Sequence, residues 1–432
     1  MEGLLTDIII RGGSLSGSVR APPSKSYTHR AIIAASLSSG LSKVYNALIC
    51  DDIQATIEAC QKIGAEVSIS GDGTLRIIGS PKPKTPDDVI NCRDSGSTIR
   101  FMTPICALAD GITVLTGGRS LRNRPMGPLL DALSQLGVRC YSARGDGRPP
   151  IIVFGGGIRG GRAAIRGDVS SQFITGLLFA SPMAENDTSI VLSTPLESRP
   201  YVDMSLNILK RHGINVKEEQ ESFHIPSGQE YKPHDHYVEG DYSSASFLLA
   251  AAAITRSRVR VENLLRDSLQ GDRFIVKILS DVGAEVKIYS DSVEVAGSRE
   301  PLKPVNVDLR DNPDLAPVCA VLACVAKGTS VISGVRRLRF KESDRIEALR
   351  EELSKMDADI KVLDDKLVIK GASKLKGAEI DPHGDHRIAM ACAVAALVAE
   401  GETIIHNAEC INKSYPDFIR DMRLLGVEVL ER

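Results

Sequence analysis

The stretch DDIQATIEACQKIGAEVSISGDGTLRII, residues 51–78, contains most of the structural unit from which the chain is built. Its first twelve residues space apolar side chains three and four apart, which predicts an amphipathic helix. Gly64 follows, at the position where glycine commonly ends a helix. Two alternating runs, VSIS and TLRII, then flank a polar turn and predict a β-hairpin. Helix, glycine turn and hairpin together form a recognisable block.

The same junction between helix and strand recurs along the whole chain. The junctions IGAEVSI, LGVRCYS, HGINVKE, VGAEVKI, MDADIKV and LGVEVLE begin at Ile63, Leu136, His212, Val282, Met356 and Leu425. A second helix series alternates with the first and starts near Ser26, Ser97, Ser171, Ser243, Asp314 and Asp385, at intervals of 71 to 74 residues. Helices of this second series, such as ASFLLAAAAIT, are apolar nearly all round, so we expect them to be buried.

Each repeat is therefore predicted to contain, in order, a strand, a buried helix, a second strand, an outer helix and a hairpin. Six such repeats fill the chain. The sixth ends at VEVLER without a second hairpin strand, and the N-terminal run TDIIIRG could supply it. We infer that the chain closes on itself into two α/β domains of three repeats each. One domain is residues 17–237, and the other is residues 1–16 with 238–432. An open solenoid is disfavoured because its repeats are typically about 20–50 residues long.

The composition of the chain argues against several classes of protein. The net charge is −2, with 53 basic and 55 acidic residues, and so argues against a broad nucleic-acid-binding surface. Nine scattered cysteines without a CxxC pair argue against a disulfide framework or a zinc site and indicate a reducing cytoplasm. The longest apolar runs, near 315–326 and 388–399, are shorter than the ~20 residues that span a bilayer, so no membrane association is expected.

Basic and hydroxyl residues gather at the predicted helix starts. A helix start offers unpaired backbone N–H groups and the positive end of the helix dipole, so it favours anions. Taken singly, Ser26, Ser97, Ser171 and Asp314 are better explained as helix caps. His386 and the HDH run at 234–236 are interpreted as structural rather than catalytic or metal-binding. Because lysine and arginine recur beside the hydroxyls, and capping does not require them, the pattern indicates a focused anion site.

The motifs SKSYTHR, DSGSTIRFM, LRNRPMGPLLDAL, GDVSSQF, SRPYVDM, RFKESDRI, GDHRIAM and NKSYPDF together resemble those of the 5-enolpyruvylshikimate-3-phosphate (EPSP) synthase family over the full length. The resemblance implies a two-domain inside-out α/β barrel with six βαβαββ repeats, three per domain. It implies transfer of the enolpyruvyl group of phosphoenolpyruvate to the 5-hydroxyl of 3-phosphoshikimate, by addition and elimination through a tetrahedral intermediate, on the route to chorismate and aromatic amino acids. We expect no cofactor and no metal, a monomer, and closure of the two domains on the substrate.

The resemblance also implies which residues form the site. The contacts to 3-phosphoshikimate are expected from Lys25, Ser26, Arg30, Ser170, Ser171, Gln172, Ser198, Tyr201, Asp314 and Lys341. Those to phosphoenolpyruvate are expected from Lys25, Gly96, Arg124, Gln172, Arg345, Arg387 and Lys413. Asp314 is the expected base for the hydroxyl and Glu342 the expected acid at carbon, with Lys25 as the third catalytic residue.

Two positions depart from the family pattern. Asp94 stands where many members have Asn, and its charge should weaken anion binding unless Arg93 or Arg100 pairs with it. Arg337 replaces an Asn that contacts shikimate in several members, so that contact is not expected here.

Two other functions remain as alternatives. The sister enzymes that use UDP-N-acetylglucosamine as acceptor share the architecture, but they usually carry a Lys-Asn pair and a loop cysteine. This chain has Lys25-Ser26 and no cysteine in TGGRSLRNRP. A non-catalytic anion-binding protein on the same scaffold would not need the paired candidates Asp314 and Glu342.

Overall fold

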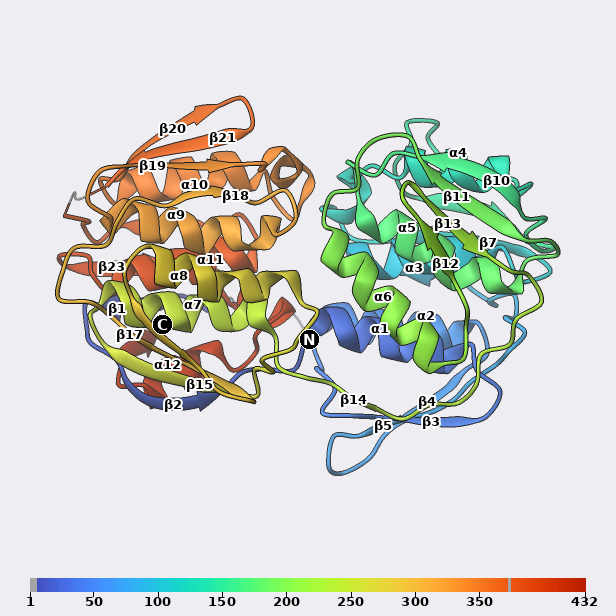
Figure 1. Ribbon diagram of the computed structural model, residues 1–432, viewed down its shortest axis with the longest axis horizontal. Helices are drawn as coiled ribbons and strands as arrows, with labels where there is room; N and C mark the ends of the chain where they lie inside the picture. The colour runs from blue at the N-terminus through green and yellow to red at the C-terminus, as the bar shows by residue number, and fades with distance from the viewer. Residues whose placement is uncertain (1–5, 372–373) are drawn as a thin grey trace. The chain divides into compact units, whose positions relative to one another are not determined.

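The computed structural model describes residues 6–371 and 374–432 (Figure 1). Residues 1–5, which the sequence assigns to the second domain, lie outside these ranges. The chain divides into two compact units. We call Pro23–Val238 the middle unit, and Met1–Pro22 with Glu239–Arg432 the terminal unit, because it holds both ends of the chain. Each unit contains three four-stranded sheets, so the six predicted repeats are confirmed.

The middle unit has three inner and three outer helices. The inner helices are α1 (Lys25–Ser36), α3 (Gly96–Cys106) and α5 (Ser171–Ala180), and the outer ones are α2 (Asp51–Lys62), α4 (Gly127–Gln135) and α6 (Arg199–Arg211). Its sheets, in spatial order, are β14 (His236–Tyr237), β3 (Leu41–Tyr45), β5 (Leu75–Ile78) and β4 (Glu66–Ile69); β6 (Ile90–Asn91), β7 (Ile112–Thr116), β9 (Ile151–Phe154) and β8 (Cys140–Ser142); and β10 (Gly161–Ile165), β11 (Thr188–Leu192), β13 (Ser222–Ile225) and β12 (Lys217–Glu219).

The terminal unit repeats this plan. Its inner helices are α7 (Tyr242–Ile254), α9 (Ala316–Val325) and α11 (His386–Ala396), and its outer helices are α8 (Ile275–Asp281), α10 (Arg345–Lys355) and α12 (Phe418–Leu424). Its sheets are β16 (Glu285–Ile288), β17 (Ser292–Ala296), β15 (Arg258–Glu262) and β2 (Ser16–Arg20); β18 (Asn306–Asp308), β19 (Thr329–Ser333), β21 (Lys366–Lys370) and β20 (Asp359–Leu363); and β22 (Glu379–Ile380), β23 (Glu402–Ile405), β1 (Ile8–Arg11) and β24 (Val429–Glu431).

The strand register shows that the chain closes on itself as predicted. Strand β1 lies antiparallel between β23 and β24, with Ile9 opposite both Ile404 and Leu430. The N-terminal run thus completes the sheet of the sixth repeat. The hairpin predicted within residues 51–78 is also present, as the antiparallel pair β4 and β5.

Each of the two segments that lead from one unit to the other carries a strand that pairs within the unit that the chain is leaving. Strand β2, which precedes α1 in the chain, pairs in parallel with β15 of the fourth repeat, with Val19 opposite Val261. Strand β14, which precedes α7, pairs in parallel with β3 of the first repeat, with His236 opposite Val44. The chain consequently crosses after Pro22, whereas the sequence placed the boundary after residue 16. The difference arises because β2 finds its partner some 240 residues further along the chain.

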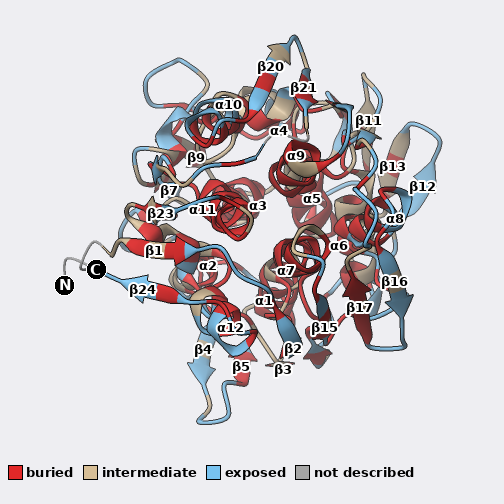
Figure 2. Ribbon diagram, turned by 90° about the vertical axis from the view of Figure 1, so that its left-hand side faces the viewer, coloured by how far each residue is buried: buried red, intermediate tan, exposed pale blue. Residues whose placement is uncertain are grey.

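Burial separates the two helix series (Figure 2). Every residue of α11 is buried, and so is every residue of α7 from Tyr242 to Ala253. The outer helix α2 buries one face, which includes Ile53, Ile57 and Cys60. Each unit has its own hydrophobic core. Within the described ranges, no helix combines the length and the apolar character needed to cross a membrane.

Candidate active site

Serine side chains cap the inner helices of the middle unit, but they are not the serines that the sequence suggested. The caps are Ser24, Ser95 and Ser170. At α5, for example, the Ser170 hydroxyl accepts a hydrogen bond from the backbone N–H of Gln172 at 3.3 Å. The site candidates Ser26, Ser97 and Ser171 lie inside the first turns. Their hydroxyls are therefore not occupied by capping, and the capping alternative is wrong for them.

Lys25 begins α1 and forms an ion pair with Asp52 on α2. Its Nζ lies 2.9 Å from Asp52 Oδ2, and the two side chains are 16% and 7% exposed. A buried carboxylate is stable when a cation accompanies it, so Asp52 fixes the lysine ammonium at the helix start. Asp52 is not among the site residues predicted from the sequence. The sequence feature that could have indicated it is the pair of aspartates at the start of the outer helix in the same repeat.

Arg30 is almost completely buried and holds two helix starts together. Its guanidinium donates to the backbone carbonyl of Ser26 at 2.8 Å, to that of Tyr201 at 2.9 Å and to the Ser205 hydroxyl at 2.9 Å. Burial lowers the pKa of Arg30 to about 10, so it is still protonated at neutral pH. Arg30 thereby joins the first turn of α1 to the first turn of α6.

Gln172 connects the second and third repeats, and Arg124 lies against the helix start of the second. Gln172 Nε2 donates to the Ser97 hydroxyl at 2.8 Å, and its Oε1 accepts from Arg100 at 2.7 Å. A methyl group placed on Gly96 would lie 2.7 Å from Arg124 Nη1, so a larger residue at the start of α3 would displace this guanidinium.

Ser198 stands at the start of α6 in a left-handed backbone conformation, with φ 56°. A non-glycine residue in this region is uncommon, and such positions cluster at binding sites. Ser198 is 3% exposed, and its backbone carbonyl accepts the N–H of Tyr201 at 3.1 Å.

The terminal unit brings its predicted site residues together around Arg345. This side chain is 1% exposed and contacts three carboxylates: Asp314 at 2.9 Å, Glu342 at 2.6 Å and Asp385 at 2.7 Å. Lys413 Nζ lies 3.9 Å from the other oxygen of Glu342. Asp385 caps α11 and also binds Arg345, a contact that is not predicted from the sequence. Such a network can be buried because every carboxylate in it has a cationic partner.

Asp314 lies in the short 3₁₀ turn η4 (Pro313–Leu315) just before α9 and contacts three cations. Besides Arg345, its carboxylate reaches Lys341 at 3.2 Å and Arg387 at 3.3 Å. Burial acts to raise the pKa of Asp314, but the charges of Arg387, Lys341 and Arg345 hold it well below its usual range. Burial also lowers the pKa of Lys341. Asp314 is therefore ionised and, while these cations surround it, only a weak base.

Asp94 and Arg337, the two departures from the family pattern, both bind neighbouring backbone. Asp94 Oδ1 accepts the N–H of Leu121 at 3.0 Å. Arg93, one of the two partners suggested for Asp94, forms its ion pair with Glu58 instead, at 2.8 Å. Arg337 donates to the backbone carbonyl of Arg310.

Two histidine-containing clusters lie apart from these residues. His212 donates from Nδ1 to the Lys232 carbonyl at 2.7 Å, which leaves its Nε2 to accept from His236 Nε2 at 2.8 Å. This hydrogen bond ties the end of α6 to β14 and supports a structural role for the HDH run.

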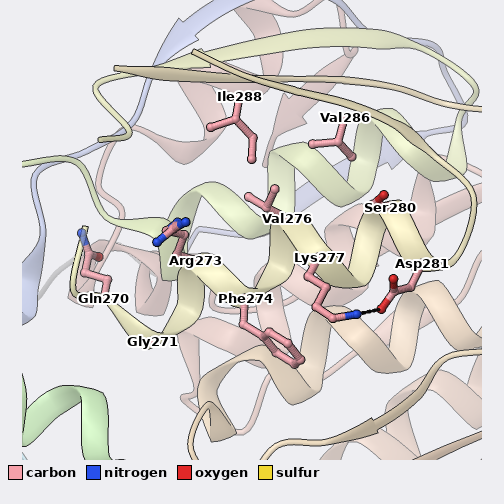
Figure 3. Close-up of a pocket in the computed structure, with 10 residues that line it drawn as sticks. All are labelled: Gln270, Gly271, Arg273, Phe274, Val276, Lys277, Ser280, Asp281, Val286 and Ile288. Carbon is pink, nitrogen blue, oxygen red and sulfur yellow. Dashed lines mark hydrogen bonds and ion pairs between the residues drawn. The ribbon is translucent and has the colours of Figure 1, made fainter. Parts of the chain in front are cut away.

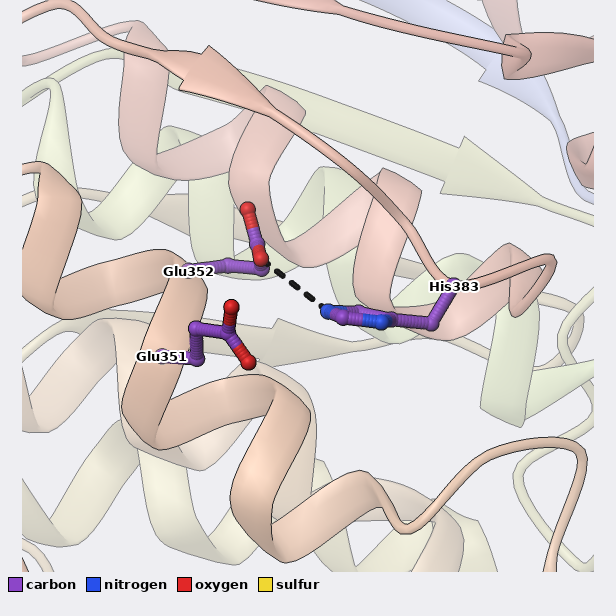
Figure 4. A group of neighbouring side chains, drawn as sticks. All are labelled: Glu351, Glu352 and His383. Carbon is purple, nitrogen blue, oxygen red and sulfur yellow. Dashed lines mark hydrogen bonds and ion pairs between the residues drawn. The ribbon is translucent and has the colours of Figure 1, made fainter.

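The second cluster contains Glu351, Glu352 and His383 (Figure 4). The fully buried Glu352 has both oxygens 2.8 Å from Lys355 Nζ and one 3.0 Å from His383 Nε2. The lysine ammonium already neutralises this carboxylate, so the cluster is explained as a structural ion pair.

Comparison with known proteins agrees with these motifs and this fold. The model of the family "EPSP synthase (3-phosphoshikimate 1-carboxyvinyltransferase)" matches residues 9–422. The chain is 44% identical to the 3-phosphoshikimate 1-carboxyvinyltransferase of Methanocaldococcus jannaschii, over 98% of each chain. It is 47% identical to that of Methanocella arvoryzae, over 96% and 97%. The crystal structure of an EPSP synthase from Acinetobacter baumannii superposes with a TM-score of 0.83 at 27% identity, covering 99% of this chain and 100% of that one.

These matches extend over nearly the whole chain, and the repeated sheets reproduce the inside-out α/β barrel of that family. The chain therefore belongs to the EPSP synthase family, and it transfers the enolpyruvyl group of phosphoenolpyruvate to 3-phosphoshikimate in the shikimate pathway of aromatic amino-acid biosynthesis.

Proposed function

We propose that the middle unit binds 3-phosphoshikimate through the first turns of its helices. Ser170, Ser171 and Ser198 bind the phosphate group, since α5 and α6 start at these residues. The remaining contacts of this unit come from Lys25, Ser26, Arg30, Gln172 and Tyr201. Arg30 acts largely by orienting the first turns of α1 and α6, because its guanidinium donates hydrogen bonds to the carbonyls of Ser26 and Tyr201.

Phosphoenolpyruvate takes its ligands from both units. Lys25, Gly96, Arg124 and Gln172 belong to the middle unit, and Arg345, Arg387 and Lys413 to the terminal unit. Five cationic side chains suit a molecule with a phosphate and a carboxylate group. Because the ligands are divided in this way, the substrates must draw the two units together, and small-angle scattering should show a more compact enzyme when 3-phosphoshikimate is bound.

The chemistry is an addition followed by an elimination. Glu342 donates a proton to the methylene carbon of phosphoenolpyruvate while Asp314 removes the proton of the 5-hydroxyl, and the hydroxyl oxygen bonds to the adjacent carbon. Lys25 stabilises charge on the phosphate. The tetrahedral adduct then loses a proton from the new methyl group and expels phosphate, which forms the enol ether. Each carboxyl group reverses its role in this second step.

The observation that carries this mechanism is the set of cations around Asp314. Lys341, Arg345 and Arg387 lie within 3.3 Å of its carboxylate and are themselves proposed substrate ligands. Anionic substrates that bind these cations offset their effect on Asp314 and raise its pKa. The base thus becomes strong only when both substrates are in place.

Asp314→Asn tests this assignment, with phosphate release from phosphoenolpyruvate as the readout. We expect kcat with 3-phosphoshikimate to fall about 10²–10⁴-fold while the protein stays folded. The matched control is Asp308→Asn, which removes an exposed pair with Arg310 and should leave kcat unchanged. Retention of full activity by Asp314→Asn would rule out Asp314 as the base. Phosphate release with UDP-N-acetylglucosamine as the only productive acceptor would overturn the choice of substrate.

The remaining proposals concern the state of the enzyme in the cell. The enzyme is proposed to be a monomer, and light scattering coupled to size exclusion measures this directly. All nine cysteines are free thiols, as is typical of proteins in a reducing cytoplasm.

A further inference from the structure

Arginine is concentrated in one part of the middle unit. Residues 117–148 contain six arginines and no lysine, but only two acidic residues. The whole chain carries 53 basic and 55 acidic residues, so this segment has an unusual excess of positive charge. Four of its arginines are exposed and lie on two loops, a first loop at 117–126 and a second loop at 143–150. These four, which the proposed substrate contacts do not include, are Arg119, Arg122, Arg144 and Arg148.

The two loops meet beside Arg124. The backbone N–H of Met126, at the end of the first loop, donates to the carbonyl of Gly147 in the second loop at 2.8 Å. Arg124 itself belongs to the first loop, is 5% exposed and lies against Gly96 at the start of α3. The exposed arginines therefore belong to the same pair of loops as the buried guanidinium that we propose as a ligand of phosphoenolpyruvate.

The acidic groups that contact these loops do not neutralise them. Asp146 forms an ion pair with Arg144 at 2.7 Å, and the two side chains are 40% and 51% exposed. Asp94 accepts a backbone N–H of the first loop at 3.0 Å. Within the part of the chain that the structure describes, the guanidinium groups of Arg119 and Arg122 form no ion pair or hydrogen bond. The two loops consequently keep an excess of positive charge.

A local ion pair is the ordinary role of an exposed cation, and the cavity beside α8 in the terminal unit contains an example (Figure 3). The cavity measures about 510 Å³, and Lys277 on its wall lies 2.6 Å from the carboxylate of Asp281, one helical turn away. Such a pair offsets the charge of the lysine. Arg119 and Arg122 have no partner of this kind, so ion pairing does not account for their presence.

We propose that Arg119, Arg122, Arg144 and Arg148 form a capture surface that draws phosphoenolpyruvate towards Arg124. This inference rests on the proposed role of Arg124. An excess of positive charge attracts a small anion over roughly the Debye length, which is about 8 Å at physiological ionic strength, so the arginines act without touching the bound substrate. They raise the local concentration of phosphoenolpyruvate and hence kcat/KM, whereas kcat does not depend on them.

The double variant Arg119→Gln/Arg122→Gln tests the proposal through the ionic-strength dependence of kcat/KM for phosphoenolpyruvate, with 3-phosphoshikimate saturating. At about 0.01 M ionic strength, where the Debye length is about 30 Å, kcat/KM should fall about fivefold. At about 1 M, where the Debye length is about 3 Å, variant and wild type should agree within about twofold. The value of kcat should be unchanged at both ionic strengths.

The matched control is the double variant Arg76→Gln/Arg162→Gln. It removes the same charge from exposed positions of the same unit, on strands β5 and β10, and should leave kcat/KM unchanged at either ionic strength. The variant Arg119→Lys/Arg122→Lys keeps the charge but loses the planar fork of arginine, so it should behave as wild type.

Two results of these measurements overturn the proposal. One is a wild-type kcat/KM of Arg119→Gln/Arg122→Gln at low ionic strength. The other is a loss that persists at high ionic strength or that lysine does not restore, because it would indicate direct contact with the substrate.

Arg124→Gln, measured in parallel, separates this inference from the proposed site, since a direct ligand should lower kcat/KM at every ionic strength. If Arg124→Gln is impaired while Arg119→Gln/Arg122→Gln matches wild type, the capture surface alone fails. If Arg124→Gln is fully active, the proposed contact between Arg124 and phosphoenolpyruvate fails with it.

Discussion

The middle and terminal units share one repeat but arrange polar groups differently at their helix starts. In the middle unit the helices are capped by serines, and further serine hydroxyls lie in the first turns beside the ion pair of Lys25 and Asp52. In the terminal unit Arg345 binds three carboxylates and Asp314 contacts three cations. Hydroxyls suit the binding of a phosphorylated ring, whereas dense ion pairs can adjust the proton affinity of an acid and a base. The proposed mechanism accordingly places most contacts to 3-phosphoshikimate in the middle unit and both proton transfers in the terminal unit, which also supplies three of the proposed ligands of phosphoenolpyruvate.

The largest expected effect of a single substitution is that of Arg345→Met. It leaves the carboxylates of Asp314, Glu342 and Asp385 without their shared cation, and breaking a buried ion pair in this way costs about 3–5 kcal/mol. Urea unfolding measures the loss, and activity should disappear with it. Arg350→Met is the matched control, because Arg350 forms an exposed pair with Glu347 on the same helix and should contribute at most about 1 kcal/mol. Equal losses for the two variants would show that the network does not depend on Arg345.

The two units should also respond to acid in opposite directions. In the middle unit burial lowers the pKa of His29 and His236 to about 3 and that of His212 to about 4. Their unfolded forms gain protons below about pH 6.5, so stability falls as the pH drops from there towards 4, by up to about 1.4 kcal/mol per pH unit for each histidine. In the terminal unit the pKa of Asp272 is raised to about 6. Its contribution to stability grows as the pH falls from 6 towards 4, because only the folded form keeps the proton.

Hydrogen exchange followed by mass spectrometry at pH 7 and pH 5, corrected for intrinsic rates, compares these units directly. Peptides from α1 and α5 should lose protection, whereas peptides from α7 and α9 should gain it. His212→Gln should reduce the loss in the middle unit alone. A uniform loss in both units would show that the buried histidines do not set the acid response.

The smallest expected effect separates capping from binding at α1. Ser24 accepts the N–H of Tyr27 as the helix cap, so Ser24→Ala should cost about 1 kcal/mol of stability and leave the KM for 3-phosphoshikimate unchanged. Ser26→Ala should do the reverse, with an unchanged melting temperature and a raised KM. If both variants lower stability equally, the hydroxyl of Ser26 is structural as well.

Much of the fold follows from local sequence patterns. The inner helices begin within about two residues of the predicted positions, because apolar runs and the polar residues before them mark a helix start. The pairing of β2 with the fourth repeat and of β14 with the first could not be predicted in this way. Both strands pair with partners about 190 to 240 residues distant, and a local pattern does not reveal which sheet a strand joins.

The site residues likewise include some that the sequence predicts and some that only the structure reveals. The six that the sequence assigned to the terminal unit do meet in one network. Asp52 and Asp272 are absent from the predicted site, and Asp385 is predicted only as a helix start, because an acidic residue there is ordinarily explained by capping or by the helix dipole. Only the tertiary fold shows that these carboxylates are buried beside cations and other acids of the site.

Binding and turnover can be separated in one experiment on Ser171→Ala and Glu342→Gln. Calorimetric titration with 3-phosphoshikimate gives Kd for each variant, and phosphate release at saturating substrates gives kcat. If the middle unit binds and the terminal unit transfers protons, Ser171→Ala should raise Kd about tenfold with kcat within about threefold of wild type. Glu342→Gln should keep Kd and lower kcat at least about 100-fold. Two results would contradict this assignment of binding and proton transfer. One is a Glu342→Gln enzyme that binds poorly but turns over normally, and the other is a Ser171→Ala enzyme that binds normally but does not turn over.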